Sequence, residues 1–277
     1  MTEPASGKET DCATDRAPDW ATDRAQEWAA DWAGDAAWCA ADPHFGADDP
    51  AVGVFLRWLD AFVRGGPRDL VLLGDMFDVW VGLPASQTEE QRTILGVLGA
   101  VVKGGRRVVY LRGNRDYFIE GPLAEAGILL RDQWDLETAG GVIHFEHGDL
   151  INSSDHAYLR WREISRSGSV GALFRRLSPA RQRAIAQKLR KSMSGTNSYF
   201  KAYRPERELD RWARALAAGG TKTAILGHFH LDESVEIAGV LVRFVPQFRE
   251  DAAFLRIRKD GTTILQRGLN PLKPDEG

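Results

Sequence analysis

The sequence is poor in cysteine and has no long apolar run. Its 277 residues include two cysteines, Cys12 and Cys39, which excludes a disulfide framework and a cysteine-rich metal site and fits a reducing cytosol. No run approaches the roughly 20 apolar residues that cross a bilayer. No basic start is followed by an apolar block, so we expect no secretory signal. Any membrane role should therefore be peripheral.

A strong net charge is also lacking. The formal net charge of -3 gives no overall attraction to nucleic acid. The charges are unevenly distributed, because residues 1–50 are acidic whereas residues 174–191 contain seven basic residues and no acidic one. No aromatic platform interleaves with these basic residues, so we expect no nucleic-acid partner.

Residues 1–36 differ in composition from the rest. They contain an imperfect repeat, "ATDRAPDW" followed by "ATDRAQEW", rich in alanine and acidic residues. The period matches no packed repeat, which predicts a loose helical or disordered extension.

From residue 37 onward, apolar strand-like runs alternate with helical patterns. Strands are predicted within 36–46, 69–75, 107–114, 141–149, 221–230, 235–247 and 252–268. Helices are predicted within 51–63, 89–105 and 123–130. Continuous apolar strands between helices predict an α/β architecture with a covered sheet. Residues 151–220 are almost wholly helical and polar, which predicts a helical insertion, or lid, over a core made of 37–150 and 221–270.

Polar side chains with metal-binding chemistry recur where five predicted strands end. Ligand sites in open α/β sheets lie just past the carboxyl ends of strands, so we expect these side chains to meet. A single Asp or His in such a place is usually a turn former or a structural residue, and the interpretation depends on their conjunction. The candidate metal ligands are Asp42, His44, Asp75, Asn114, His147, His228 and His230.

These ligand types predict two divalent ions that share a carboxylate. Asp75 can bridge ions at the ~3.5–4 Å separation of two-metal hydrolytic sites. One ion would be held by Asp42, His44, Asp75 and His230, and the other by Asp75, Asn114, His147 and His228. Nitrogen and oxygen ligands without thiolate suit manganese, iron or zinc. Such a pair would attract a phosphate or diphosphate and lower the pKa of an attacking water.

The motif order D-x-H, G-D-x-x-D, G-N-x-D, H-G-D, G-H-x-H resembles the calcineurin-like metallophosphoesterases over residues 37 to about 235. More narrowly, "GDMFDVWVG", "LRGNRDYF" and "HGDLINSSDHAYLRWR" are similar to the UDP-2,3-diacylglucosamine hydrolase family. The resemblance implies a metallophosphoesterase-type β-sandwich core flanked by helices. It implies hydrolysis of UDP-2,3-diacylglucosamine to UMP and 2,3-diacylglucosamine 1-phosphate in lipid A biosynthesis. It favours manganese and a cytoplasmic location, peripheral on the inner membrane.

The resemblance also implies roles for individual residues. It gives the metal-ligand role to the seven residues above. Catalytic roles are implied for Asp75, Asn114, Arg115 and His147. Substrate contacts are implied for Arg115 on a phosphate, for Asp155 and Tyr158 near the sugar, and for Ser194, Asn197, Lys201 and His228.

Some positions depart from the family pattern. "LDE" follows "GHFH" where Arg-Pro is usual, and "VPQFRED" lacks an expected Trp-His. These differences leave open a metallophosphoesterase acting on another nucleotide or phosphodiester. A non-enzymatic scaffold that has lost its first metal is a further alternative, because "CAADPHFG" is a weak strand. The survival of all seven ligand types argues against it. The oligomeric state is left open.

Arg115 bears on the leaving group. A histidine at this place could protonate a departing alkoxide, whereas arginine, with a pKa above ~12, cannot. Arginine grips phosphate oxygens instead. A phosphate leaving group, with a second pKa of about 6, needs little protonation at pH 7. Arg115 therefore favours a substrate with a P–O–P bond, unless it serves only to pair with Asp116.

The basic part of the insertion predicts a membrane contact. An apolar stripe lies beside its arginines, formed by Leu173, Phe174, Leu177, Ile185 and Leu189. A basic amphipathic helix can lie on an anionic membrane surface and meet a lipid substrate. The alternative is a solvated helix face.

Overall fold

The computed structural model describes residues 32–193 and 204–268. Most of the predicted extension 1–36 lies outside these ranges. The folded core begins earlier than predicted, because the first strand starts at Asp35. Trp32 is buried and packs edge-on against Trp38, with 4.8 Å between ring centroids.

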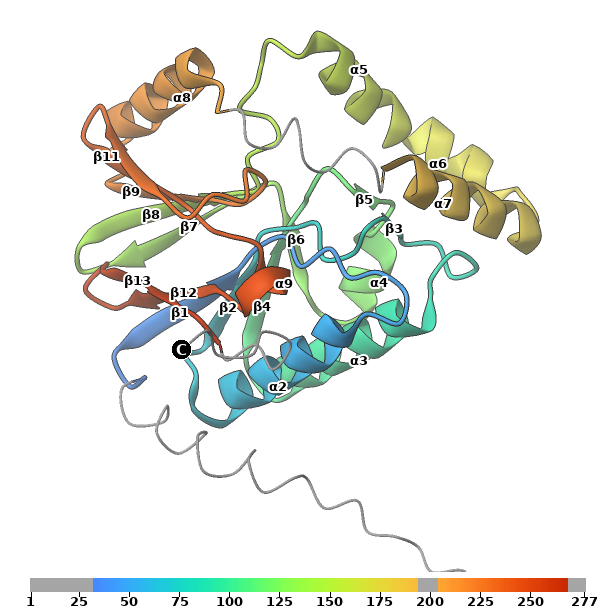
Figure 1. Cartoon of the computed structure of the whole chain (residues 1–277), viewed down its shortest axis with the longest axis horizontal. Helices are drawn as coiled ribbons and strands as arrows, with labels where there is room; N and C mark the ends of the chain where they lie inside the picture. The colour runs from blue at the N-terminus through green and yellow to red at the C-terminus, as the bar shows by residue number, and fades with distance from the viewer. Residues whose placement is uncertain (1–31, 194–203, 269–277) are drawn as a thin grey trace, which may run out of the picture.

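Two stacked β-sheets form the centre of the molecule (Figure 1). The first has, in spatial order, β13 (Thr263–Gln266), β12 (Phe254–Arg258), β1 (Asp35–Ala40), β2 (Asp69–Leu72), β4 (Arg107–Leu111) and β6 (Leu129–Arg131). The second has β10 (Ser234–Ile237), β11 (Val240–Phe244), β9 (Thr223–Leu226), β8 (Gly141–Glu146) and β7 (Gln133–Thr138). A short parallel pair, β3 (Trp80–Val81) and β5 (Asp116–Tyr117), lies beside them.

Alternation along the strands separates an inner from an outer layer of the core. On β1, Ala37 and Cys39 belong to the apolar layer between the sheets, whereas Trp38 and Ala40 belong to the layer under the helices. A strand covered on both faces must be apolar throughout. This explains why β1, β2 and β4 read as nearly continuous apolar runs.

Helices cover the outer face of the first sheet. These are α2 (Pro50–Gly65), α3 (Glu89–Lys103) and α4 (Glu120–Glu125). The Asp49 side chain accepts from the Ala51 backbone N–H at 3.0 Å and caps α2. Thr88 and Gln91 form a capping box at the start of α3. Phe55 and Trp58 of α2 pack into the aromatic cluster around Trp38.

Helix α8 (Glu206–Ala218) covers the outer face of the second sheet (Figure 1). The short α9 (Phe248–Asp251) lies beside the end of β1, where the Phe248 N–H donates to the Ala41 carbonyl at 3.0 Å. Leu209 and Ala213 of α8 are buried against Val240 and Val242 of β11. The predicted insertion 151–220 therefore includes a helix that belongs to the core layers.

Three helices stand away from the sandwich: α5 (His156–Ser165), α6 (Gly168–Arg175) and α7 (Pro179–Met193). They connect to the core through an apolar cluster in which Ala186, Phe174 and Leu189 pack near Val79, Val81 and Tyr117. We call α5–α7 the lid. Among the helices of the described ranges, none has the length and apolar content that spanning a bilayer would require.

The α/β prediction is confirmed, with local corrections. The segment 123–130 was predicted to be one helix, but α4 ends at Glu125 and β6 begins at Leu129. Gly127, with φ of +74°, turns the chain between them. Strand β7 was not predicted, because its sequence "QWDLET" is largely polar and only Leu136 is buried.

Candidate metal centre

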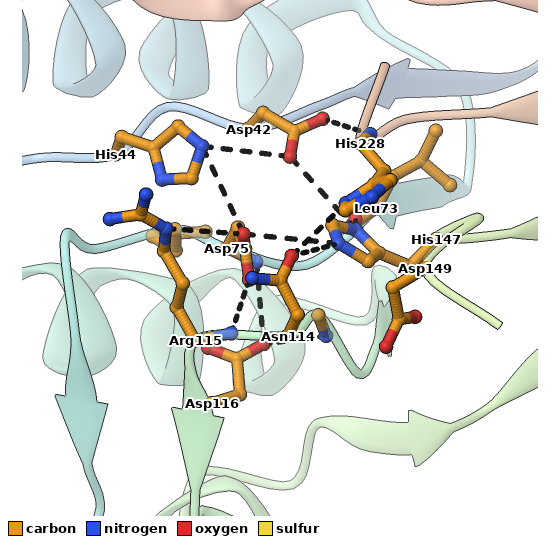
Figure 2. Close-up of polar contacts among 12 residues, drawn as sticks. Asp42, His44, Leu73, Asp75, Asn114, Arg115, Asp116, His147, Asp149 and His228 are labelled. Atoms are coloured by element: carbon orange, nitrogen blue, oxygen red, sulfur yellow. Dashed lines mark hydrogen bonds and ion pairs between the residues drawn. The ribbon is translucent and has the colours of Figure 1, made fainter. Parts of the chain in front are cut away.

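The predicted ligands meet at one edge of the sandwich, where strands of both sheets end. Asp42, Asp75 and Asn114 follow β1, β2 and β4, which are parallel neighbours. His147 and the pair His228 and His230 follow β8 and β9, parallel neighbours in the other sheet. Figure 2 shows Asp42, His44, Asp75, Asn114, His147 and His228 pointing toward one another. The prediction that these strand ends converge is therefore confirmed by the geometry.

The backbone at these positions adopts an uncommon conformation. Positive φ values occur at five predicted ligands: Asp42 (48°), His44 (47°), Asp75 (48°), His228 (62°) and His230 (55°). Non-glycine residues in this region cost of order 1–3 kcal/mol each and cluster at functional sites. The fold thus tolerates local strain that aims these side chains into one space.

One group of ligand atoms gathers around Asp42. His44 Nε2 lies 3.3 Å from His230 Nε2 and 3.8 Å from Asp42 Oδ1. His230 Nε2 lies 3.6 Å from the same Asp42 oxygen. These atoms are close enough for one cation to contact all three. Gln247, which follows β11, lies at the rim of this group, with its Nε2 3.4 Å from His230 Nε2.

A second group gathers around Asp75. His147 Nε2 lies 3.8 Å from Asp75 Oδ2, and His147 Nδ1 lies 4.0 Å from Asp42 Oδ1. Asn114 Oδ1 lies 3.1 Å from both His147 Nε2 and His228 Nδ1. Asp42 is common to both groups, and Asp75 Oδ2 also lies 3.9 Å from His44 Nε2. Both carboxylates, rather than Asp75 alone, therefore lie between the two groups.

The surroundings of two carboxylate oxygens show whether this site suits cations. Within the described residues, Asp42 Oδ1 and Asp75 Oδ2 are buried and accept no hydrogen bond. A buried anionic oxygen without a partner is costly. Each faces the nitrogen atoms of the histidines, the arrangement that divalent ions require. The residues present therefore fit a pair of divalent cations.

The histidine rings are oriented for the same task. His147 Nδ1 donates to the Leu73 backbone carbonyl, which leaves Nε2 as the atom that faces Asp75 and Asn114. Such second contacts set the tautomer of metal-binding histidines. Burial disfavours a charged ring, but the carboxylates of Asp75 and Asp42 outweigh it and raise the pKa of His147. The Asp42 and Asp75 carboxylates thus surround the histidine with negative charge.

Arg115 lies inside the site instead of on its rim. The side chain is 2% exposed, and its Nε lies 3.7 Å from Asp75 Oδ2. Its Nη1 donates to the Asp78 carbonyl at 2.9 Å, and its Nη2 to the Met193 carbonyl of α7 at 3.4 Å. The end of the lid therefore covers the arginine that was predicted to hold a phosphate.

The alternative interpretation of Arg115 requires an ion pair between Arg115 and Asp116. The carboxylate of Asp116 instead binds two backbone N–H groups and a tyrosine hydroxyl. It accepts from the backbone N–H of Gly113 at 2.7 Å and of Asp75 at 3.3 Å, and from the Tyr110 hydroxyl at 3.1 Å. Burial and the nearby Asp75 carboxylate raise the pKa of Asp116 to about 6. Asp116 therefore orients the loops that carry Asp75 and Asn114.

The other predicted substrate residues are placed less directly. Asp155 caps α5, accepting from the Tyr158 N–H at 2.9 Å. The Tyr158 hydroxyl donates to buried Asp149. Ser194, Asn197 and Lys201 lie outside the described residues. The substrate-contact roles of these residues stay predictions.

Asp149 was missed as a site residue, although it ends the H-G-D motif. It is buried, and its Oδ2 also accepts from Arg162 Nε at 2.9 Å. Burial opposes its charge, but His147 and Arg162 lower its pKa below the ordinary value. The Tyr158–Arg162 spacing of four residues on a predicted helix was the signal that could have pointed to it.

Comparison with known proteins gives a coherent set of relatives. No protein-family model matches the chain. A protein named UDP-2,3-diacylglucosamine hydrolase from Azotobacter vinelandii is 32% identical over 198 residues, which cover 69% of this chain and 79% of the relative. Its namesake from Pseudomonas paraeruginosa is 30% identical, with coverage of 72% and 84%. That from Shewanella pealeana is 28% identical, with coverage of 81% and 95%. Among solved structures, an archaeal phosphodiesterase shares 11% identity at a TM-score of 0.45 over 84% of this chain, a likeness too remote to bear on activity.

Proposed function

Since the chain belongs to the UDP-2,3-diacylglucosamine hydrolase family, we propose that it hydrolyses the diphosphate of UDP-2,3-diacylglucosamine to UMP and 2,3-diacylglucosamine 1-phosphate. The observation that carries the proposal is the pair of ligand groups around Asp42 and Asp75, each with a buried carboxylate oxygen that has no hydrogen-bond partner among the residues the structure describes. A site of this kind serves to bind a phosphate-containing substrate between two cations.

Asp42, His44, Asp75, Asn114, His147, His228 and His230 would hold the two ions in this proposal. When bound, the ions polarise the phosphorus–oxygen bonds and lower the pKa of an attacking water. Manganese is the metal we propose, because mixed imidazole, amide and carboxylate ligands suit it and family resemblance favours it, while iron and zinc suit the same ligands.

Arg115 would stabilise the departing phosphate. Its guanidinium lies beside Asp75, and it carries a positive charge at every physiological pH. It cannot serve as a proton donor, so it suits a leaving group that needs no proton. A sugar 1-phosphate meets that condition, because its second pKa is near 6.

The lid would bring the enzyme to its lipid substrate at the cytoplasmic face of the inner membrane. It carries the exposed apolar side chains Trp161, Ile164, Leu173 and Ile185. The exposed cations Arg175, Arg176, Arg181, Arg183 and Lys188 lie on α6, its end and α7, which contain no acidic residue. Phe174 and Leu189 of the predicted stripe pack inward, so the apolar contact is narrower than predicted. Anionic lipid attracts such cations at about 1 kcal/mol each.

Flotation with vesicles tests this membrane proposal. Protein should float with phosphatidylglycerol-containing vesicles and not with neutral ones. Leu173→Ser should weaken flotation, whereas Leu241→Ser, exposed on strand β11 of the sandwich, should not. Equal binding to both vesicle types, or none, would contradict it.

An assay of UMP release tests the reaction itself. Purified protein with Mn²⁺ should release UMP from UDP-2,3-diacylglucosamine. His44→Ala should lower the rate about 100-fold or more, and His156→Ala, exposed at the start of α5, should leave it unchanged. The stretch "VPQFRED", which lacks the expected Trp-His and places Gln247 beside His230, favours the alternative of a different phosphodiester substrate. No UMP release together with good turnover of a soluble phosphodiester would decide for that alternative.

A further inference from the structure

One face of α5 contacts both loops that carry ligands of the second group. Tyr158, Arg162 and Arg166 are spaced four residues apart, so they lie on one side of the helix and its end. Tyr158 and Arg162 both bind Asp149, two residues after His147. Arg166 Nη2 donates to the Gly113 carbonyl at 2.5 Å, directly before Asn114.

The guanidinium of Arg166 is largely buried between α5 and residues 113–117. It lies 5.6 Å from the centre of the Tyr117 ring, and its charge stabilises the buried Asp116 carboxylate. Within the described part of the chain, Nε and Nη1 of Arg166 are buried and have no hydrogen-bond partner. Burying a cation with donors unsatisfied costs free energy. The hydrogen bond to Gly113, the Tyr117 ring and the attraction of the Asp116 carboxylate offset this cost, and all three groups belong to residues 113–117.

The contacts of α5 with Asp149 and with the Gly113 carbonyl affect the distance between Asn114 and His147. Asn114 Oδ1 and His147 Nε2 lie 3.1 Å apart, although they come from different sheets. Asp149 fixes the His147 loop to α5, and the Gly113 carbonyl fixes the Asn114 loop to the same helix. Both contacts are charge-assisted and point from one rigid element, so the helix sets the separation of the two loops.

We propose that the Tyr158–Arg162–Arg166 face of α5 positions the Asn114 and His147 loops relative to each other, and that Arg166 is a positioning residue for metal binding. This inference rests on the proposed metal ligands. Because α5 is the first helix of the lid, the position of the lid and the geometry of the metal centre depend on each other. A lid displaced from the core would also weaken the metal site.

The test compares Arg166→Ala and Arg166→Lys with Arg160→Ala, an exposed arginine on the same helix. Mn²⁺ affinity is measured by calorimetry without substrate. Loss of such supporting contacts typically weakens metal binding about 10- to 100-fold, and we expect this for Arg166→Ala. Arg166→Lys keeps one donor for Gly113 and should recover part of the loss. Arg160→Ala should bind like the unmodified protein.

Further readouts separate positioning from other roles. Hydrogen exchange of the 113–117 peptide in metal-free protein should rise in Arg166→Lys, which keeps the charge and is the milder change. The turnover number of Arg166→Ala should fall, while its KM should stay near that of the unmodified enzyme. Unchanged Mn²⁺ affinity in a folded Arg166→Ala protein, or a raised KM with unchanged affinity, would overturn the proposal. Unmodified protein that binds Mn²⁺ but releases no UMP would overturn only the proposed reaction.

Discussion

Gly113 and Asp75 approach so closely that no side chain fits between them. A Cβ atom placed on Gly113 would lie 2.2 Å from Asp75 Oδ1 and 2.5 Å from the Asp75 backbone nitrogen. In return, Asp75 Oδ1 accepts from the Arg115 N–H at 2.7 Å. The turn after β4 therefore packs directly against the Asp75 carboxylate, and this close approach requires glycine at position 113.

Gly113→Ala should accordingly disable the metal centre. The added methyl must displace either the Asp75 carboxylate or the loop that carries Asn114, so we expect loss of Mn²⁺ binding and of UMP release. Metal analysis after dialysis against Mn²⁺ measures the first directly.

A glycine in open space is the matched control. Nothing lies within 4 Å of a Cβ added at Gly96, in the middle of α3. Gly96→Ala should keep the metal and raise stability by about 1 kcal/mol. Full metal content in Gly113→Ala would show that the loop can shift without cost to the site.

Removal of the cations should destabilise the fold. Asp42, Asp75 and Asp116 are each fully buried and close together. Mn²⁺ at 100 times its Kd adds about 2.7 kcal/mol of stability. We therefore expect EDTA to lower the melting temperature and Mn²⁺ to restore it.

The variant Asp75→Asn tests whether the Asp75 carboxylate is responsible for the effect of Mn²⁺ on the melting temperature. An amide oxygen can still accept from the Arg115 N–H, while one negative charge is removed. In EDTA this variant should melt no lower than the unmodified protein, and Mn²⁺ should raise its melting temperature less. A large Mn²⁺ response in the variant would mean that Asp75 is dispensable as a ligand.

Arg115→Lys should lower the turnover number by about 100-fold, because an ammonium cannot make paired hydrogen bonds to phosphate. The metal content should stay intact, since the loop is held by the Arg115 backbone N–H and by Asp116. Steady-state kinetics with parallel metal analysis distinguishes the two effects. Loss of metal with the activity would place Arg115 among the supports of the site.

His144 should make stability depend on pH. Its Nδ1 lies 2.6 Å from Asp135 Oδ1, and its Nε2 lies 3.5 Å from Glu146 Oε2. Burial disfavours the charged ring, but the Glu146 and Asp135 carboxylates outweigh it and raise the pKa of His144. A raised pKa in the folded state stabilises the fold fully below the ordinary pKa of about 6.5. That contribution disappears as the pH rises through the folded-state value.

Urea unfolding of His144→Gln checks this sign. The variant should be less stable than the unmodified protein at pH 6, and the difference should shrink by pH 9. Exposed His156 supplies the control His156→Gln, which should show no such trend. A difference that is constant with pH would assign His144 a packing role alone.

The predicted metal ligands could be found in the sequence because each follows a strand-like run. Parallel strands end at the same edge, so Asp42, Asp75 and Asn114 had to meet once the strands were recognised. The backbone strain at Asp42 and His44 could not be predicted, because aspartate and histidine adopt positive φ more often than most residues but only in a small minority of cases. The burial of Arg115 under Met193 was not readable either, since it depends on how the lid packs.

The contacts of α5 were hidden for another reason. Arg162 and Arg166 look in the sequence like solvated charges on a polar helix. Their partners, Asp149 and the Gly113 carbonyl, come from loops of different sheets, and only the tertiary arrangement brings them within reach. Polar edge strand β7 was missed because one buried residue, Leu136, gives no alternating pattern.

The pairing of His44 with His230 joins positions 186 residues apart. During synthesis the first of these leaves the ribosome long before the second. Strands β1, β2, β4 and β6 of the first sheet and the lid are therefore synthesised while one metal group still lacks a ligand. Metal loading should be a late event in the maturation of this protein, after β9 has joined the second sheet.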